Sequence, residues 1–317
     1  MRGPSGTTGL LISLMLSTLL WGCASNPNNG EADPYGLLYE GASTAAYGTA
    51  FPADTPEEAY ANAELASRSG DLDRALFEYI RGLRLEDDEH RRAHPLYRIG
   101  EIHHERGNLR LAEMAYRWAL EADPEHGAAG TGLGILHLQR RHYSTAEAQL
   151  ESVARSGHGS WRTHNALGIL ADLQGRFPQA ARHYERALEA SPDNPIALNN
   201  LGYSLYLAGD WAGAKRALTQ AVRLYPDYQL AWRNLGLVHA RQRDYDEALQ
   251  AVARSGSEAE AYNDIGYVSM LEGRYEEAME FFMEALRLSP SYYVTASENA
   301  RYTERRLRRA AAAADPE

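Results

Sequence analysis

The chain has 317 residues, of which 44% are apolar and 24% are charged, and its formal net charge is −11. This composition is typical of a soluble globular protein, and the acidic balance argues against nucleic acid as the main partner. With a single cysteine, the chain can form neither an internal disulfide nor a zinc site built from cysteines.

The N-terminal segment has the pattern of a secretory signal. One basic residue, Arg2, precedes a mainly apolar run over residues 10–21. A run of this length is too short to cross a bilayer, which takes about 20 residues, but it fits the apolar core of a signal peptide. We therefore expect residues 1–22 to be a signal that is removed.

The end of this segment, Leu20-Trp21-Gly22-Cys23, resembles a bacterial lipobox. The resemblance implies that the chain is cut before Cys23 and that this cysteine then carries a lipid anchor such as palmitate. Because Ala24 follows instead of an aspartate, it also implies sorting to the outer membrane of a Gram-negative bacterium, on the periplasmic face. An ordinary signal peptide and an uncleaved anchor are the alternatives.

Residues 24–55 are rich in small and polar residues and show no apolar periodicity. Such a segment behaves as a flexible chain, and its root-mean-square span is about 30 Å. We expect residues 23–55 to be a lipidated cysteine followed by a flexible tether, which holds a soluble body near a membrane surface.

From residue 56 onward the sequence repeats itself. The segment LGILADLQGRFPQAARHYERALEASPDNP begins at Leu167, and LGYSLYLAGDWAGAKRALTQAVRLYPDYQ matches it 34 residues later, from Leu201. A glycine recurs in successive units, at Gly100, Gly134, Gly168, Gly202, Gly236 and Gly266. An alanine lies 12 residues after each glycine, at Ala112, Ala146, Ala180, Ala214, Ala248 and Ala278. Periods of this length indicate a solenoid of repeated supersecondary units.

Each unit predicts two helices packed in antiparallel fashion. Apolar residues just before the glycine share one face of the first helix. A glycine inside a helix costs about 1 kcal/mol relative to alanine, so its recurrence needs a packing reason, which is the close approach of two helices. Turns such as QGRF, AGDW and EGRY separate the helices, and a proline ends most units.

This pattern resembles the tetratricopeptide repeat over about residues 56–292. We count about seven helix-turn-helix units, which start near residues 56, 93, 127, 161, 195, 229 and 259. The first unit is degenerate, since Ala63 replaces the glycine, and the sixth is four residues short, which predicts a truncated second helix. Residues 293–317 suit a capping helix with an Arg-rich outer side and a disordered tail. The predicted fold is an all-α tetratricopeptide-repeat solenoid.

No catalytic or cofactor motif interrupts the repeats. The sequence contains no phosphate loop, dinucleotide fingerprint, GxSxG or HExxH motif. The two adjacent histidines at 103–104 lie beside two glutamates, but neighbouring residues on a helix point about 100° apart and cannot easily share one ion. His103, His137 and His239 hold one position in three units, which favours a structural role. We expect no enzyme activity, no cofactor, no metal and no small-molecule substrate.

Polar residues recur where the first helices of a tetratricopeptide solenoid line its inner groove. These residues are Asn165, Asn199, Asn200, Arg233, Asn234 and Asn263. One helical turn further on the same face lie Ile169, Tyr203, Leu237 and Tyr267. Because an asparagine amide both donates and accepts a hydrogen bond, a row of amides can bind the main chain of an extended peptide.

The asparagine row has a second interpretation, in which the amides hydrogen-bond to neighbouring repeats. If the row binds a ligand, Asn199→Ala with Asn234→Ala should abolish partner capture and leave helicity and melting temperature nearly unchanged. If the row is structural, capture and stability should fall together.

Two stretches resemble the TadD-like lipoproteins of tight-adherence (Flp) pilus assembly. They are NNLGYSLYLAGDW, residues 199–211, and GSEAEAYNDIGYVSMLEGRYEEAMEFFMEALRLSPSYYVTASEN, residues 256–299. The resemblance implies a non-catalytic scaffold at the outer membrane whose partner is a secretin or a pilus-assembly component. A pilotin-like protein of type IV pili and an adaptor for peptidoglycan hydrolases or synthases have the same fold and anchor, and both stay open.

Overall fold

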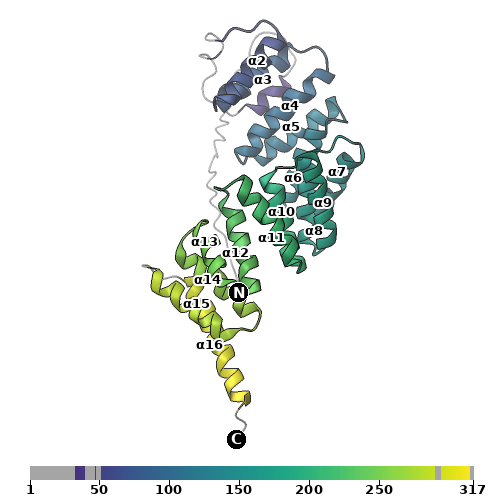
Figure 1. Cartoon of the computed structure of the whole chain (residues 1–317). Helices are drawn as coiled ribbons and strands as arrows, with labels where there is room; N and C mark the ends of the chain where they lie inside the picture. The colour runs from purple at the N-terminus through teal and green to yellow at the C-terminus, as the bar shows by residue number, and fades with distance from the viewer. Residues whose placement is uncertain (1–32, 40–46, 48–50, 290–293, 315–317) are drawn as a thin grey trace, which may run out of the picture.

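The computed structural model describes residues 33–39, 47, 51–289 and 294–314, so the predicted signal and Cys23 lie outside the described residues. All regular secondary structure in these residues is helical, with fifteen α-helices and two short 3-10 helices (Figure 1). None of the described helices combines the length and the apolar character that crossing a membrane requires.

The α-helices pair into seven antiparallel units. The first helices are α2 (Pro56–Arg68), α4 (Ala93–Glu105), α6 (Gly127–Gln139), α8 (Trp161–Leu173), α10 (Pro195–Ala208), α12 (Gln229–Gln242) and α14 (Glu258–Leu271). The second helices are α3 (Leu72–Leu85), α5 (Leu109–Ala122), α7 (Tyr143–Arg155), α9 (Phe177–Ala190), α11 (Trp211–Leu224), α13 (Tyr245–Ala253) and α15 (Tyr275–Leu288). A last helix, α16 (Val294–Ala314), packs on α14 and α15. The predicted all-α solenoid with a C-terminal helix is confirmed.

Local sequence sets where the helices begin and end. Helix α10 starts at Pro195, and the Asn194 side chain accepts hydrogen bonds from the backbone N–H groups of Ile196 and Ala197. The helix ends at Ala208 and is capped by Gly209, whose φ of 84° lies in the left-handed region that glycine adopts without strain. Helix α13 has only 9 residues, whereas the other second helices have 13 or 14. The truncated second helix expected in the sixth unit is therefore present.

The recurring glycines lie where the two helices of a unit meet. A Cβ atom at Gly168 would lie 2.5 Å from Cε1 of the buried Tyr184 ring, and one at Gly100 would lie 2.5 Å from Cδ1 of Tyr116. Real Cβ contacts do not come this close, so each glycine makes room for a large side chain of the second helix. The recurring glycines are thus explained by packing, because an aromatic or aliphatic side chain of the second helix lies directly against the backbone of the first helix.

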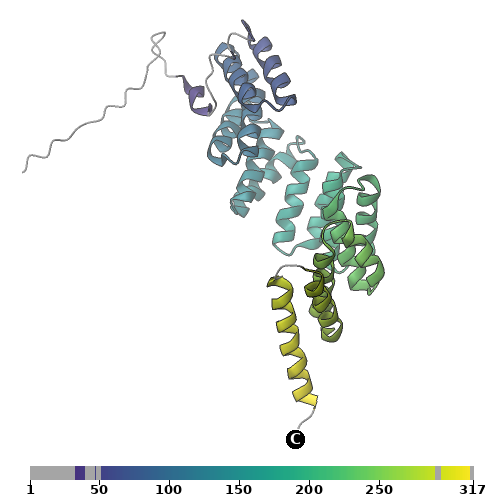
Figure 2. The same ribbon diagram turned by 90° about the vertical axis from the view of Figure 1, so that its left-hand side faces the viewer.

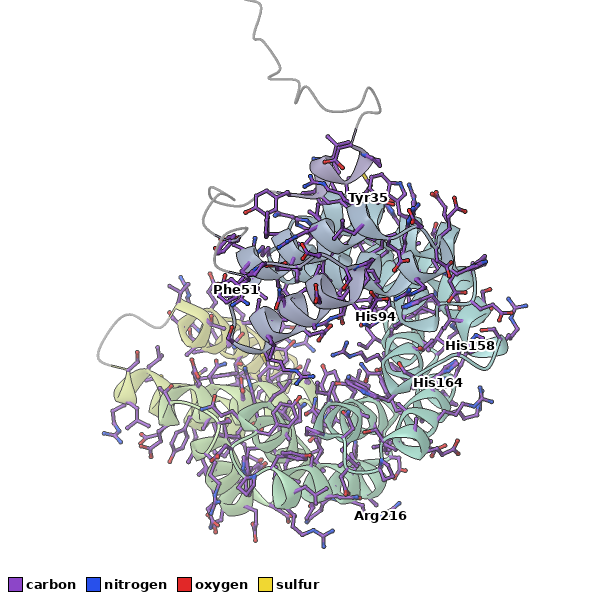
Figure 3. The ribbon with its side chains drawn as sticks, turned by 90° about the horizontal axis from the view of Figure 1, so that it is seen from above. Tyr35, Phe51, His94, His158, His164 and Arg216 are labelled. Atoms are coloured by element: carbon purple, nitrogen blue, oxygen red, sulfur yellow. The ribbon has the colours of Figure 1, made fainter. Side chains whose placement is uncertain are left out.

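The units stack into a superhelix. From α4 to α14, consecutive first helices contact one another as well as their own second helices. This places the first helices on the inner side and the second helices on the outer side of the curve (Figures 1 and 3). The N-terminal repeats and α16 lie at opposite ends of the solenoid (Figure 2). Side chains of the first helices therefore form the inner surface.

A short helix near the N-terminus lies against the first repeats instead of standing free. Helix η1 (Pro34–Leu38) packs on α3, and Leu38 is fully buried. The Leu38 carbonyl lies 2.8 Å from His103 Nε2, and the Tyr35 ring meets the Trp118 ring edge-on at 6.1 Å. A carboxylate of Asp33 also pairs with Arg84.

The segment just before α2 is held as well. Arg81 Nη1 donates a 2.8 Å hydrogen bond to the Phe51 carbonyl, and Arg74 stacks over the Phe51 ring at 3.2 Å. The prediction of a flexible tether over residues 24–55 is therefore wrong for residues 33–39 and 51–55. The sequence pattern misled because single apolar anchors such as Leu38 create no periodicity, although one buried leucine can contribute about 2 kcal/mol.

The three histidines that share one repeat position are buried. His103 is fully buried, and His137 and His239 are each 8% exposed. His239 Nδ1 lies 3.4 Å from an Asp244 carboxylate oxygen. Within the described residues, no group of three or more His, Cys, Asp or Glu side chains is placed to hold a metal ion. These environments fit the structural interpretation.

Another pair of histidines, His164 and His183, is expected to make the fold sensitive to acid. The rings of His164 and His183 stack at 6.3 Å, and the buried Nδ1 atoms of both have no hydrogen-bond partner among the described residues. Burial, helped by His164 and nearby arginines, lowers the pKa of His183 to about 4. Between pH 6.5 and pH 4 the unfolded chain therefore binds more protons at this residue than the folded chain, so stability falls as the pH falls.

We expect His183→Gln to flatten this pH dependence. Thermal melting at pH 7 and at pH 4.5 should show a smaller loss of melting temperature for the variant than for the unmodified chain. Burial also lowers the pKa values of His126, His137, His164 and His239, so part of the acid sensitivity should remain. Equal losses of melting temperature in the variant and in the unmodified chain would contradict the assignment of this pH dependence to His183.

Candidate functional site: a groove on the inner surface of the last repeats

The first helices of the last three repeats, together with α16, enclose a groove of about 730 Å³. Its lining comes from α10, α12, α14 and the first turns of α16, so all of it belongs to the inner surface. The lining residues are Asn199, Asn200, Tyr203, Leu230, Arg233, Asn234, Leu237, Glu260, Asn263, Asp264, Tyr267, Thr295 and Asn299. We call this surface the C-terminal groove.

The structure brings together eight of the ten residues that the sequence predicted for a binding groove. These eight are Asn199, Asn200, Tyr203, Arg233, Asn234, Leu237, Asn263 and Tyr267. The other two, Asn165 and Ile169, lie on α8 and do not line it. Asn165 is 9% exposed, and Ile169 packs against the buried residues Ala180 and Tyr184. The C-terminal groove thus begins one repeat later, at α10, and Asn165 and Ile169 lie outside its lining.

The asparagines form hydrogen bonds with one another across the repeats. Asn200 Nδ2 donates to Asn165 Oδ1 at 2.9 Å, Asn199 Nδ2 to Asn200 Oδ1 at 3.2 Å, and Asn234 Nδ2 to Asn199 Oδ1 at 2.9 Å. These bonds connect α8, α10 and α12 in one continuous row of amides. For this part of the row, the interpretation as contacts between repeats is the one the geometry supports.

The row is interrupted between α12 and α14. Asn263 Oδ1 accepts a 3.0 Å hydrogen bond from Asn299 Nδ2 on α16, so these two amides form a separate pair. Neither Asn234 Oδ1 nor Asn263 Nδ2 bonds to any described residue. Neither is among the fully buried polar atoms that lack a partner, so both keep some contact with solvent. The break therefore leaves one acceptor and one donor without a bond to a described residue on adjacent repeats, in side chains that are 7% and 6% exposed at the wall of the C-terminal groove.

These bonds change the expectation for the double variant Asn199→Ala with Asn234→Ala. Both side chains are buried, at 2% and 7% exposure, and they are bonded to each other. Removing a buried hydrogen bond costs about 1 kcal/mol, and neighbouring amides left unpaired add to that cost. The double variant should lower the melting temperature, so it cannot separate ligand binding from packing.

The groove also carries exposed aromatic surface. Tyr203 and Tyr267 are 40% and 44% exposed, on α10 and α14. The ring of Tyr203 stacks on Tyr206 at 6.1 Å, and the Tyr206 hydroxyl accepts a 3.1 Å hydrogen bond from Arg241 Nε. Burial alone would lower the pKa of Arg241, but its hydrogen bonds to Tyr206 and Glu272 raise that pKa, so the guanidinium stays charged. The Tyr203 ring is thus held by its contact with Tyr206 and is still exposed, as is typical of aromatic side chains that anchor protein partners.

Charged groups mark the rim of the groove. Arg233 on α12 forms a two-bond ion pair with Asp264 on α14, at 2.7 Å and 3.1 Å. The Arg233 side chain is 51% exposed, so its pairing with Asp264 contributes little to stability, although it links α12 and α14 beside the amide break. Glu260, at the start of α14, is exposed on the same rim.

Five lining residues were not among the ten predicted for the groove: Leu230, Glu260, Asp264, Thr295 and Asn299. Two of them, Thr295 and Asn299, belong to α16, which the sequence suggested only as a cap. The spacing could have identified Asn299, since it lies 36 residues after Asn263, close to the repeat length. The start of α16 therefore occupies the place of an eighth first helix and closes the groove.

A further hollow lies on the inner surface of the N-terminal repeats. Two adjoining cavities of about 700 Å³ and 530 Å³ share Tyr97, Glu101 and Arg162 in their linings. Arg162 Nη1 lies 3.4 Å from Glu101 Oε1, so this ion pair lines both cavities. The sequence had no pattern for this surface, because its residues differ from repeat to repeat.

Comparison with known proteins fits this architecture. One model of the tetratricopeptide repeat matches residues 97–160, 131–195, 165–214 and 200–256, and a second matches residues 259–292. Photosystem I assembly protein Ycf3 of Cyanophora paradoxa is 27% identical over 141 residues, which are 44% of this chain and 70% of that protein.

Solved structures share the fold at low identity. The Cut9–Hcn1 structure matches with a TM-score of 0.54 and 18% identity, over 78% of this chain and 46% of that chain, so this chain spans less than half of it. PilF of Pseudomonas aeruginosa matches with a TM-score of 0.53 and 20% identity, over 65% of this chain and 95% of that chain. The repeat matches and the seven helix pairs show that this chain belongs to the tetratricopeptide repeat family, a scaffold for protein–protein interaction.

Proposed function

We propose that the protein is a non-catalytic scaffold lipoprotein that binds an extended segment of a protein partner in its C-terminal groove. The observation that carries the proposal is the break in the amide row, where Asn234 Oδ1 and Asn263 Nδ2 make no hydrogen bond to a described residue. An extended peptide presents N–H and C=O groups in alternation, so one main chain can donate to Asn234 and accept from Asn263.

The aromatic surface beside the break supports a peptide ligand. Tyr203 and Tyr267 stand on either side of α12, and both are partly exposed. Main-chain hydrogen bonds supply binding that tolerates many sequences, whereas side-chain pockets beside aromatic rings select among them. The groove thus combines a sequence-tolerant main-chain site with two places where the partner's side chains can be distinguished.

The location and the partner form the finer part of the proposal. The lipobox-like order ending in Cys23 supports a lipid anchor at the periplasmic face of the outer membrane. The TadD-like stretches support a role in Flp pilus assembly, with a secretin or another assembly component as partner. The likeness to PilF concerns the fold alone.

The test is to purify the tagged full-length chain from membranes of its own host and to identify by mass spectrometry what it retains. We expect a secretin or pilus-assembly component, and we expect Tyr203→Ala with Tyr267→Ala to lose it. Retention of a peptidoglycan hydrolase or synthase would replace the pilus role with the adaptor role. A protein retained equally by both chains would contradict binding in the groove.

A further inference from the structure

Helix α16 carries a concentration of positive charge on an acidic protein. Between residues 294 and 314 it has five arginines against two glutamates, a formal charge of +3 on a chain whose net charge is −11. The arginines are Arg301, Arg305, Arg306, Arg308 and Arg309. All five are exposed, so the C-terminal end of the solenoid presents a basic surface.

The basic half of the helix covers no part of the core. Ala296 and Thr303 are fully buried and Ala300 is 8% exposed, so the helix packs through its first ten residues. No residue from 304 to 311 is buried, and the helix extends past α14 and α15 (Figures 1 and 2). Four of the five arginines lie in this projecting half. A helix that caps the hydrophobic core needs a polar outer side only where it covers that core, so capping does not explain these four arginines.

Helix stability does not account for the arginines either. Cations stabilise the C-terminal end of a helix within its last turn, but the last turn of α16 holds no basic residue. Arg308 pairs with Glu304 with its side chain 76% exposed, and Arg306 Nε donates a 3.0 Å hydrogen bond to the Tyr275 hydroxyl. Within the described part of the chain, no carboxylate pairs with Arg301, Arg305 or Arg309. Their charges are thus available to a partner.

We propose that the projecting half of α16 binds the surface of a membrane that contains anionic phospholipids. A guanidinium group binds a phosphate oxygen pair in a two-bond geometry, and every basic residue of α16 is an arginine. The arginines at 305, 308 and 309 are spaced i, i+3 and i+4, so they share one face of the helix and can contact one flat anionic surface together. Tyr302, 44% exposed and next to Arg305 at 5.9 Å, is a residue type enriched at membrane interfaces.

The projecting half of α16 has little apolar surface, and this limits how deeply it can enter a membrane. Leu307 is its one large aliphatic residue and is only partly exposed. The helix therefore adsorbs to headgroups through charge and does not insert. Binding by charge alone weakens steeply with salt, since the Debye length falls from about 10 Å at 0.1 M to about 3 Å at 1 M.

The test uses the chain from residue 24 onward, which contains every described residue and no lipid anchor, so its outcome does not depend on Cys23. Flotation with vesicles of phosphatidylcholine containing 30% phosphatidylglycerol should recover the protein at low salt, whereas pure phosphatidylcholine vesicles should not. Arg305→Gln with Arg308→Gln and Arg309→Gln should weaken the partition on the order of a hundredfold, because each arginine near an anionic surface contributes about fivefold.

A matched control removes the same charge elsewhere. Lys215→Gln with Arg216→Gln and Arg223→Gln changes the outer face of α11 and should leave vesicle binding within twofold. Equal losses of vesicle binding in both triple variants would show that only the net charge of the protein matters, and this would overturn the proposal. Binding to soluble polyglutamate but not to the anionic vesicles would also overturn it, in favour of an acidic protein partner. Unchanged melting temperatures confirm that the variants are folded.

Discussion

Tyr184→Ala is expected to lower the free energy of unfolding by about 3–5 kcal/mol, the usual cost of removing a fully buried aromatic ring. Tyr184 is 1% exposed and its hydroxyl donates a 2.8 Å hydrogen bond to Asp172, which also accepts one from Ser204 at 2.6 Å. Burial raises the pKa of Asp172, so this carboxylate depends on its two donors when it is ionised. Urea unfolding followed by circular dichroism measures the loss.

A double-variant cycle tests the packing reason for the glycines. Gly168→Ala alone should destabilise by about 1–2 kcal/mol, because its Cβ would meet the Tyr184 ring and the clash exceeds the gain in helix propensity of about 1 kcal/mol. In the Tyr184→Ala background the ring is absent, so Gly168→Ala should be neutral or stabilising. Additive effects in the cycle would show that the glycine is there for another reason.

Tyr203→Ala with Tyr267→Ala is expected to weaken partner binding by at least about a hundredfold. Truncation of a tyrosine at the centre of an interface costs on the order of 2 kcal/mol, more than tenfold for each ring. Both rings are partly exposed, so the melting temperature should change little. Titration calorimetry with the purified partner gives the affinity, and thermal melting gives the stability.

Trp211→Ala with Tyr225→Ala is the matched control for this variant. Trp211 and Tyr225 are 38% and 42% exposed, close to the groove pair, but they do not line the C-terminal groove. We expect this control to bind the partner with unchanged affinity. A similar loss of affinity in both double variants would show that the partner does not use the groove.

The fold was predictable because its two constraints are local and periodic. Glycine and alanine must recur wherever two helices approach closely, and Gly100 to Gly266 record that requirement along the chain. The groove residues from α10 to α14 were predictable for the same reason, since one position of each repeat faces inward. Periodicity alone could not show where the groove begins, and so it included Asn165 and Ile169, which lie outside the groove lining.

The structural features that the sequence did not predict depend on contacts that do not recur from repeat to repeat. Leu38 is buried by long-range packing against α3, which no pattern in residues 24–55 announces. The bonds among the asparagines depend on amide positions in neighbouring helices, so the sequence could not tell which amides stay accessible. The break between Asn234 and Asn263 lies at the shortened sixth unit, where the regular spacing changes.

The most direct test of the C-terminal groove is photocrosslinking in living cells from two single positions. A photoreactive amino acid at Tyr203 faces the inner surface, and one at Arg216 lies on the outer side of α11 (Figure 3). We predict a protein adduct from position 203 and none of the same mass from position 216. The same adduct from 216, with none from 203 in a folded and membrane-bound chain, would contradict binding in the groove.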